Sequence, residues 1–460
     1  GPPAAARRDA TSKREMLRFA LPALGIYVAD PIMSNIDNGF VGRFGGTAAL
    51  ASLGPGTVVA NNLLFIFNSI LSSATTGLVA RAMADPARGT EGARKELSRT
   101  LSFAWTAGTV LTLVYLLFTP WMLRRLGTPD AIVASAASYA RIRGAVAWAV
   151  LSQSVCLSAI LATRDAVTPL KVVMLAAVLN FAGDWMFCVW PFHLVVSGAA
   201  AATALSTLAG FALMLRALAR KKLMPDVRLP SLKDAGPILE YAGPLFVITS
   251  ARVLGFTAMG VTATALGTVP LAGFQVAISI FVFFAFFAAP MSQTAQSMLP
   301  PLIEAGDTDG LRRAGSNIIA IAACVSAFVM MLCYLTLTYG NVFFTADQAV
   351  RAAIRAAAPP VVLAAGTLLL SSSIDGALVA AKDFRFIIPA QISVCMLQLS
   401  LLFCFQRAGF GLPAIFLTFA IRLWAFMSMS AVRLFLGRGP LGRVLRPGVP
   451  KPVLAAATGA

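Results

Sequence analysis

The sequence predicts an all-α polytopic membrane protein whose 12 transmembrane helices form two pseudo-symmetric six-helix bundles. Three observations lead to this fold class. Of the 460 residues, 58% are hydrophobic and only 12% charged, and the mean hydropathy is +0.80, whereas soluble domains carry about 25% charged residues. Apolar runs of 18 or more residues recur along the chain, each long enough to cross ~30 Å of hydrocarbon as a helix. Finally, short sequence matches recur in the same order in the two halves of the chain, which indicates an internal repeat.

The basic residues give the orientation of the expected spans. These spans cover residues 17–43, 48–80, 100–123, 139–163, 171–192, 196–215, 238–266, 270–301, 314–340, 356–381, 386–406 and 409–432. With the N-terminus inside, 27 Lys and Arg fall in inner tails and loops, 8 on the outer side and 2 within helices. This positive-inside asymmetry places both termini on the inner face. It also accounts for the net charge of +18 without a nucleic-acid partner.

The longest polar break, residues 216–235, divides the spans six and six. Short matches recur between the halves at a nearly constant offset, and Arg164-Asp165 corresponds in this way to Lys382-Asp383. Since six is even, the repeats are parallel, as in transporters whose two lobes enclose a central cavity. The expected domains are an N-terminal tail (1–15), a six-helix lobe (16–218), an inner loop (219–237), a second lobe (238–436) and a basic C-terminal tail (437–460).

Cysteine and histidine usage favours neither disulfide bonds nor a metal site. All six cysteines fall within apolar spans and are expected to be small buried residues: Cys156, Cys188, Cys324, Cys333, Cys395 and Cys404. The lone histidine, His193, stands at a span end beside Trp190, which is typical of an interfacial residue. Gly1-Pro2 is typical of the scar left by protease removal of a tag, and we find no secretory signal in the sequence.

Two carboxylates and an amide form the first candidate site. Asp37 in the first span and Asp184 in the fifth lie beyond the expected midplane, in the outer half of the N-terminal lobe. Asn180 precedes Asp184 by one helical turn and shares its face. Ionisable groups at such depth cost about 3 kcal/mol or more and usually mark function. The pair can hold a proton or coordinate Na⁺ through oxygen ligands; the alternative is two separate structural polar groups.

The remaining intramembrane charges form the second candidate site, a substrate cavity. When the second half of the sequence is aligned on the first, Asp30 corresponds to Arg252. The two residues can therefore form an ion pair between the lobes, or each can face a water-filled cavity. Alternatively, the Arg252 guanidinium is the counter-charge of an anionic substrate, because guanidinium matches carboxylate well. Asp375 in the tenth span can bind substrate, bind a second proton or serve as structural polar contact. Gln275 is counted with the cavity residues, and Arg422 is the second cation within a span.

Several stretches together resemble DinF-type members of the MATE (multidrug and toxic compound extrusion) family across essentially the whole chain, from residue 16 to about residue 436. They are PIMSNIDNGFVG (31–42), NFAGD (180–184), GAAAAT (198–203), ATRDAVTP (162–169) and DGALVAAKD (375–383). The stretches SLGPGTV (52–58) and PMSQTAQSMLP (290–300), with the cation Arg252, are similar to the plastid branch of the family in plants and algae.

The resemblance implies a V-shaped pair of six-helix bundles that exports small organic solutes by H⁺- or Na⁺-coupled antiport. Carried over by position, Asp37, Asn180, Asp184 and Thr203 match the cation site of the family. Some relatives use a glutamate in the seventh helix; this chain has Arg252 there, so that variant of coupling is not expected. The resemblance implies no cofactor beyond the coupling ion.

The expectation is therefore a secondary antiporter of small organic solutes, with the presence of Arg252 favouring organic anions. The alternatives are a lipid or lipid-intermediate flippase of the same superfamily, a cationic drug exporter, or a channel or receptor. An enzyme is disfavoured, because no histidine, cysteine or serine stands in a catalytic constellation. We expect a monomer in the lipid bilayer of the plastid envelope, with the plasma or vacuolar membrane as alternatives.

Overall fold

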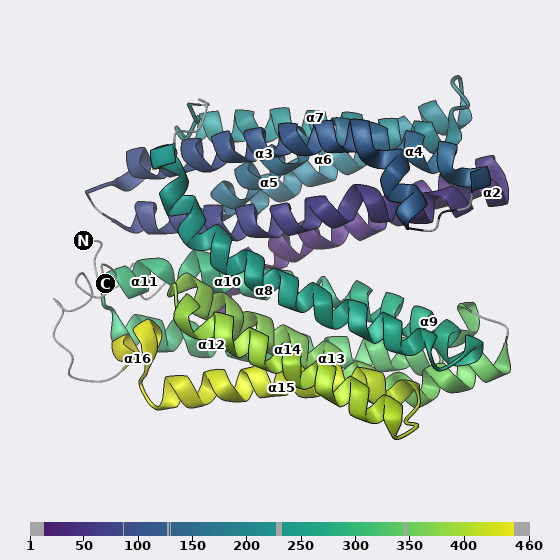
Figure 1. The fold of residues 1–460 in the computed structure, drawn as a ribbon. Coiled ribbons are helices and arrows are strands. Elements are labelled where there is room, and N and C mark those ends of the chain that lie inside the picture. Colours follow the sequence, from purple (N-terminus) through teal and green to yellow (C-terminus); the bar gives the residue numbers. More distant parts are fainter. Residues whose placement is uncertain are drawn as a thin grey trace. The chain divides into compact units, whose positions relative to one another are not determined.

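The computed structural model describes residues 13–445, apart from residues 86, 127, 129, 227–231, 345 and 346. Every regular element in this part of the chain is helical (Figure 1). The elements are α2 (Lys13–Ala84), α3 (Gly89–Arg125), α4 (Asp130–Ala145), α5 (Ala147–Ala162), α6 (Val167–Asp184), the π-helical turn η1 (Trp185–Val189), α7 (Val195–Arg220), α8 (Leu232–Thr264), α9 (Thr268–Ala285), α10 (Ala288–Met298), α11 (Pro300–Glu304), α12 (Thr308–Thr338), the 3₁₀ turn η2 (Gly340–Phe343), α13 (Gln348–Ala380), α14 (Phe384–Arg407), α15 (Leu412–Phe435) and α16 (Gly439–Leu445).

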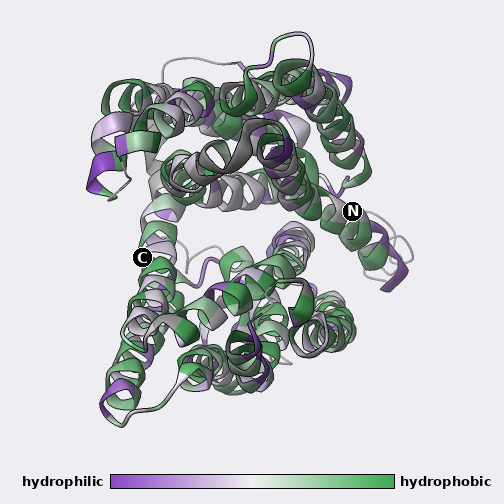
Figure 2. Cartoon of the chain, turned by 90° about the vertical axis from the view of Figure 1, so that its right-hand side faces the viewer, coloured by the Kyte–Doolittle hydropathy of each residue, from purple (hydrophilic) through white to green (hydrophobic). Residues whose placement is uncertain are grey.

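The membrane spans confirm the predicted number. Among the described residues, 11 helical segments are long and apolar enough to cross a bilayer, and the pair α4 and α5, bent by 48°, supplies a twelfth. The continuous helix α2 contains two of these segments, Lys13–Gly45 and Ser52–Ala84. Most of the helical ribbon carries hydrophobic residues (Figure 2). The all-α, multi-pass prediction therefore holds.

The described chain divides into two compact units, one covering residues 25–243. In this unit α7 packs against α4, α5 and α6, and α3 packs against α4 and α5. Tyr115, on α3, is fully buried and donates a hydrogen bond of 2.9 Å to the Ala60 carbonyl of α2. The packing brings the first, fifth and sixth spans of the chain together, and these spans carry the predicted cation site.

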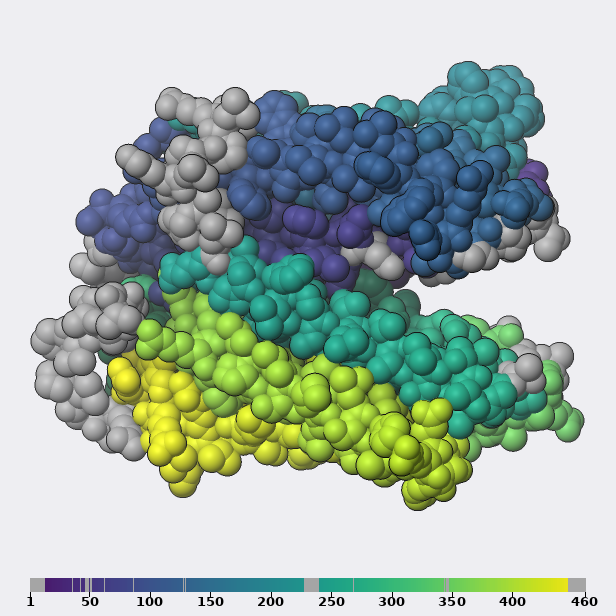
Figure 3. Space-filling view, in the orientation of Figure 1, coloured from purple at the N-terminus to yellow at the C-terminus, as the bar shows by residue number. Residues whose placement is uncertain are grey.

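The second unit comprises residues 13–24 and 244–445 among those described. Its central helix is α13, which packs against α9, α10, α12 and α15, and its core is rich in phenylalanine, including Phe281 and Phe416. Helices α8, α14 and α15 lie side by side on the face shown in Figure 3. The predicted boundaries at residues 16, 219, 238 and 437 stay predictions.

Two equivalent turns support the internal repeat. Arg164, two residues beyond α5, has φ 63°, and Lys382, two residues beyond α13, has φ 55°. Each is followed by an aspartate that pairs with a cation at the end of a helix two spans later. Asp165 lies 2.8 Å from Nζ of Lys221, and Asp383 accepts two hydrogen bonds from Arg433 at 2.8 and 2.9 Å.

The cysteines depart in part from expectation. Four are buried, but Cys324 on α12 and Cys404 on α14 are exposed on the surface of their helices. A thiol is a weakly polar group that behaves as a small apolar residue. The outward face of a membrane helix therefore accepts it as readily as the core does.

Candidate coupling and substrate sites

The predicted cation-site residues lie together in the unit of residues 25–243. Oγ1 of Thr203, on α7, lies 3.1 Å from Oδ2 of Asp37 on α2. Nδ2 of Asn180, on α6, donates to the same Oγ1 at 3.4 Å. The carboxyl groups of Asp37 and Asp184 are neighbours whose charges interact. Three helices thus bring two acids, an amide and a hydroxyl to one point.

This cluster is closed off from solvent and short of hydrogen-bond donors. Asp184 is fully buried, Asp37 is 5% exposed and Asn180 is 1% exposed. Three of the four carboxyl oxygens accept no hydrogen bond from the described residues. Two adjacent carboxylates repel strongly in a low-dielectric interior. A proton shared between them, or a cation held by their oxygens, would remove the repulsion.

The local fold explains how the acids come so close to α7. Helix α6 ends at Asp184 and the chain continues as the π-helical turn η1, a distortion that often marks functional sites in helices. Gly198, near the start of α7, packs directly on η1, because a Cβ atom there would lie 2.8 Å from the backbone of Phe187. The absence of a side chain at Gly198 therefore permits the approach that places Thr203 beside Asp37.

Arg143, on α4, is a neighbour of this site that sequence reasoning missed. Its guanidinium acts electrostatically on Asp30 and Asp37, and its Nη2 lies 3.4 Å from Oδ1 of Asn61. The sequence places Arg143 near the outer end of a span, where it counts as a loop charge. The bend between α4 and α5 follows three residues later, at Val146. Which acids Arg143 approaches depends on the packing of α4, so only the structure shows it as a neighbour of the site.

In the other unit, the predicted cavity residues Arg252 and Asp375 form an ion pair. Nη2 of Arg252, on α8, lies 2.8 Å from Oδ1 of Asp375 on α13. Asp375 is well covered, with 13% of its side chain exposed, whereas 41% of the Arg252 side chain is exposed. The predicted meeting of Arg252 with Asp30 concerns two different units and stays a prediction.

A second guanidinium lies close to this pair. Arg422, on α15, is 3% exposed and donates to Oε1 of Gln398 at 2.9 Å and to the Ala251 carbonyl at 3.4 Å. Gly255, one turn beyond Ala251 on α8, leaves the space that this side chain fills, because a Cβ atom there would collide with the guanidinium and with Gln398. Arg422 forms no ion pair with any carboxylate of the described chain.

Both arginines open onto one cavity of about 90 Å³. Phenylalanine, serine and glutamine side chains complete its wall, and no other ionisable group than the two arginines and Asp375 lines it. Its lining residues are Arg252, Phe256, Leu368, Ser371, Ser372, Asp375, Gln391, Val394, Phe419, Arg422, Leu423 and Phe426. Gln275, also predicted for the cavity, is exposed on α9 and does not line it, and Asp30 is exposed on α2.

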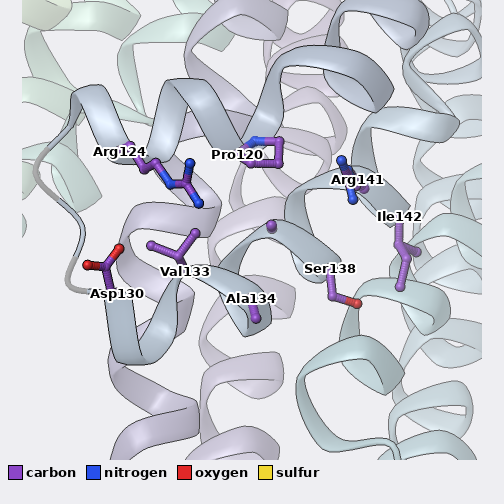
Figure 4. Close-up of a pocket in the computed structure, with 9 residues that line it drawn as sticks. Pro120, Arg124, Asp130, Val133, Ala134, Ser138, Arg141 and Ile142 are labelled. Atoms are coloured by element: carbon purple, nitrogen blue, oxygen red, sulfur yellow. The ribbon is translucent and has the colours of Figure 1, made fainter.

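A larger groove of about 630 Å³ lies between α3 and α4 in the unit of residues 25–243. Figure 4 shows Arg124 and Asp130 at one end of it and Arg141 and Ile142 at the other. This groove is open and its two arginines are exposed. Neither Asp37 nor Asp184 lines it, so it is separate from the carboxylate site.

The fold and these buried charges define a multi-pass membrane transporter rather than an enzyme. The chain belongs to the MatE family, whose model matches residues 22–186 and 244–405. Over 406 residues it is 28% identical to Protein DETOXIFICATION 47, chloroplastic, of Arabidopsis thaliana (87% of this chain, 74% of that protein). Over 196 residues it is 26% identical to DNA damage-inducible protein F of Escherichia coli (43% and 42%).

Solved structures agree with this assignment. The MATE transporter VcmN of Vibrio cholerae, in its bent form, superposes with a TM-score of 0.80 at 18% identity, covering 93% of this chain and 99% of that one. At this identity the likeness shows the fold alone. The predicted MATE resemblance is confirmed, including its likeness to plastid members.

Proposed function

We propose that this protein is a secondary antiporter in which Asp37 and Asp184 bind the coupling cation while an organic solute is exported. The observation that carries the proposal is the buried carboxyl pair, three of whose four oxygens accept no hydrogen bond from the described residues. Asn180 and Thr203 position the pair from α6 and α7. A site of this kind changes its net charge when a proton or Na⁺ enters or leaves. That change can bias the lobe between two conformations.

The first experiment follows ion binding without a known substrate. Purified protein is titrated with acid and base, with and without Na⁺, while tryptophan fluorescence and carboxyl infrared bands are recorded. Trp185, which follows Asp184 directly, is a local reporter. The variants are Asp37→Asn and Asp184→Asn. Asp30→Asn, an acid on the same helix as Asp37 but outside the pair, is the matched control.

We expect a carboxyl titration in the wild type that both pair variants lose and the control keeps. Insensitivity of this signal to Na⁺ identifies the proton as coupling ion, whereas a Na⁺-dependent signal lost in the same variants identifies Na⁺. A wild-type protein with no titration and no ion response would overturn the proposal and favour a flippase or a channel.

For the exported solute we propose an organic anion rather than a cationic drug. The support is the cavity in the second unit, where two guanidinium groups face one carboxylate. A cationic solute would have to approach a site that already carries excess positive charge. Transport by the Arg252→Ala variant should fall more for anions than for cations, and equal loss for both would contradict the anion assignment.

For its location we propose the plastid envelope, because Protein DETOXIFICATION 47 of Arabidopsis is named as chloroplastic. We also propose that the working unit is a monomer, since each candidate site is formed within one chain. Light scattering of the protein in detergent tests the second point, and a dimer in which both sites are unchanged would contradict it.

A further inference from the structure

We propose that the groove between α3 and α4 is a binding site for an anionic phospholipid whose headgroup carries one phosphodiester and free hydroxyl groups. The acyl chains of this lipid lie along the exposed apolar face of α3. The lipid is a bound partner of the protein rather than its exported solute. The inference is independent of the proposed antiport, since neither the carboxylate pair nor the cavity lined by Arg252 lies in this groove.

The first step is the distribution of charge at this end of the helices. Four of the eight basic residues expected on the outer side stand between positions 124 and 143: Arg124, Arg125, Arg141 and Arg143. Asp130 is the only acid in that stretch. Basic residues are otherwise concentrated on the inner side of this chain, as in membrane proteins in general. A positive cluster on the outer side therefore indicates an anionic partner at that level.

The second step is that two of these guanidinium groups are available to a ligand. Arg124 and Arg141 line the groove and are exposed, and neither forms an ion pair with a carboxylate of the described chain. Asp130, the one acid in the groove wall, leaves the lining with one net positive charge. A guanidinium has five N–H donors, and its planar fork matches the oxygens of a phosphate. The groove therefore suits a monoanionic phosphodiester.

The third step is the depth of Arg141. A Cβ atom on Gly144 of α4 would collide with the side chain of Tyr115 on α3, so these two residues are level. Arg141 precedes Gly144 by three residues. On the antiparallel helix α3, Phe118 follows Tyr115 by three residues, so it lies close to the level of Arg141. Phe118 is 51% exposed, as expected of a side chain that faces hydrocarbon. An arginine at such a level extends its guanidinium toward the lipid headgroups, where the phosphate is the first anionic group.

The fourth step is the order of the polar groups along the groove. Arg124 stands six residues beyond Phe118, which places it about 9 Å farther out than Arg141. Figure 4 shows Asp130 at the same end of the groove as Arg124. The charges of this outer end cancel, so it favours a neutral polar group, and the Asp130 carboxylate can accept hydrogen bonds from hydroxyl groups. A headgroup with its phosphate at Arg141 and its hydroxyl groups at Asp130 satisfies both ends.

The fifth step is the surface available to the acyl chains. Side chains at intervals of three or four residues share one face of a helix. On α3 one such stripe consists of Val110, Leu113, Leu117, Pro120 and Arg124. Its outer members Pro120 and Arg124 line the groove, and its three apolar members below them are each more than half exposed. The groove therefore continues into an apolar surface that the chains of a lipid can cover.

The test measures the binding of defined lipids to the purified full chain by native mass spectrometry from a non-ionic detergent. Wild type should bind phosphatidylglycerol about fivefold or more tightly than phosphatidylcholine with the same acyl chains. Arg141→Gln and Arg124→Gln should each weaken phosphatidylglycerol binding about fivefold, as expected for one basic residue beside an anionic headgroup. Both variants should bind phosphatidylcholine like wild type. Equal binding of the two lipids by wild type overturns the site.

Arg125→Gln is the matched control, because it removes the same charge from the next position of α3, which does not line the groove. This variant should bind phosphatidylglycerol like wild type. An equal loss in Arg125→Gln would show a general attraction to positive charge and would overturn the groove as the site. Asp37→Asn, which removes a proposed coupling acid, should also bind the lipid like wild type, so the lipid site and the antiport proposal are tested separately.

Two further comparisons test the identity of the ligand. Phosphatidylmethanol has the same phosphodiester without hydroxyl groups, so wild type should bind it about threefold more weakly than phosphatidylglycerol, and Asp130→Ala should remove that difference. Equal binding of these two lipids by wild type overturns the role of Asp130. Glycerophosphoglycerol, the same headgroup without acyl chains, should not displace the lipid. Displacement at equal concentration would show that the ligand is a soluble phosphodiester and not a lipid.

Discussion

The hydroxyl group of Thr203 connects the residues of the carboxylate site, because it forms hydrogen bonds with both Asp37 and Asn180. A hydroxyl has one proton, and Oγ1 also lies 3.0 Å from the Ala199 carbonyl. The proton can therefore point to Asp37 or to the helix backbone. The direction of this hydroxyl proton can therefore change when the Asp37–Asp184 pair gains or loses charge.

Replacing Thr203 by Val keeps the shape of the side chain and removes this donor. If the coupling ion is Na⁺, we expect the response of Trp185 fluorescence to require about a tenfold higher Na⁺ concentration, because an oxygen beside the pair is lost. If it is a proton, we expect the response at about a tenfold lower proton concentration, because the ionised Asp37 carboxylate loses a stabilising hydrogen bond. Thr203→Ser, which keeps the hydroxyl, should respond like wild type. Equal behaviour of the Val and Ser variants would remove Thr203 from the site.

Gly255 makes a second prediction at the residue scale. Its Cβ atom would collide with Arg422 and Gln398, whereas a Cβ at Gly260 of the same helix meets only Phe274 at 4.0 Å. Gly255→Ala should lower the free energy of unfolding by about 2 kcal/mol through overpacking. Gly260→Ala should leave it unchanged or raise it by about 0.5 kcal/mol, because alanine favours helix. Thermal unfolding in detergent measures both, and equal effects would contradict the packing of Arg422.

The sequence predicts the site residues better than it predicts their partners. Asn180 and Asp184 stand one turn apart on one helix, so their proximity follows from helical geometry. Arg252 and Asp375 are 123 residues apart, and their pairing depends on how α8 packs beside α13. No local rule supplies that packing. The carboxamide Gln398 had a signal that could have been used, since it follows Gln391 by seven residues on one face of an apolar helix.

At the scale of elements, Asp165 connects the turn after α5 with the start of α6 and with the end of α7. Its Oδ1 accepts from the backbone N–H groups of Val167 and Thr168 at the start of α6, and its Oδ2 contacts Lys221 after α7. Burial alone raises the pKa of Asp165, but the hydrogen bonds from Lys221 and Thr168 outweigh it and hold the pKa below its ordinary value of 3.8. The ionised form is therefore the one that stabilises the turn.

Asp165→Ala should lower the free energy of unfolding by about 1 kcal/mol near neutral pH, since it removes a helix cap and a partly exposed ion pair. A lowered pKa means that this contribution is complete above 3.8 and lost as the pH falls through the folded-state value. Thermal unfolding of wild type and variant at a series of pH values should therefore converge in acid. Asp165→Asn, which keeps the capping oxygen, should lose less; a difference independent of pH would exclude the ionised cap.

The spans themselves are predictable because their apolar length is a one-dimensional property. The 48° break between α4 and α5 at Val146 is not, since apolar length does not report where a span bends. The change from α-helix to π-helix between α6 and η1 is likewise not predictable from the apolar length of the span. Such irregular points depend on contacts with other helices, and in this protein η1 lies directly at the carboxylate site.

At the scale of the whole molecule, the internal repeat predicts how the chain crosses the membrane. Val167 and Arg385 stand at the starts of α6 and α14, which are equivalent spans of the two units. Phe192 and Phe410 follow the other ends of these spans and are exposed. A repeat of six spans is parallel, so each start should lie on the inner face and each end on the outer face.

Single cysteines at these four positions test this topology in sealed cells or vesicles of known orientation. The exposed thiols Cys324 and Cys404 are first replaced by alanine, because they are accessible on their helices. A membrane-impermeant maleimide applied from outside should label Phe192→Cys and Phe410→Cys. It should label Val167→Cys and Arg385→Cys only after permeabilisation. If Phe192→Cys and Phe410→Cys label from opposite sides, the two repeats are inverted rather than parallel, and the positive-inside assignment of the topology is wrong.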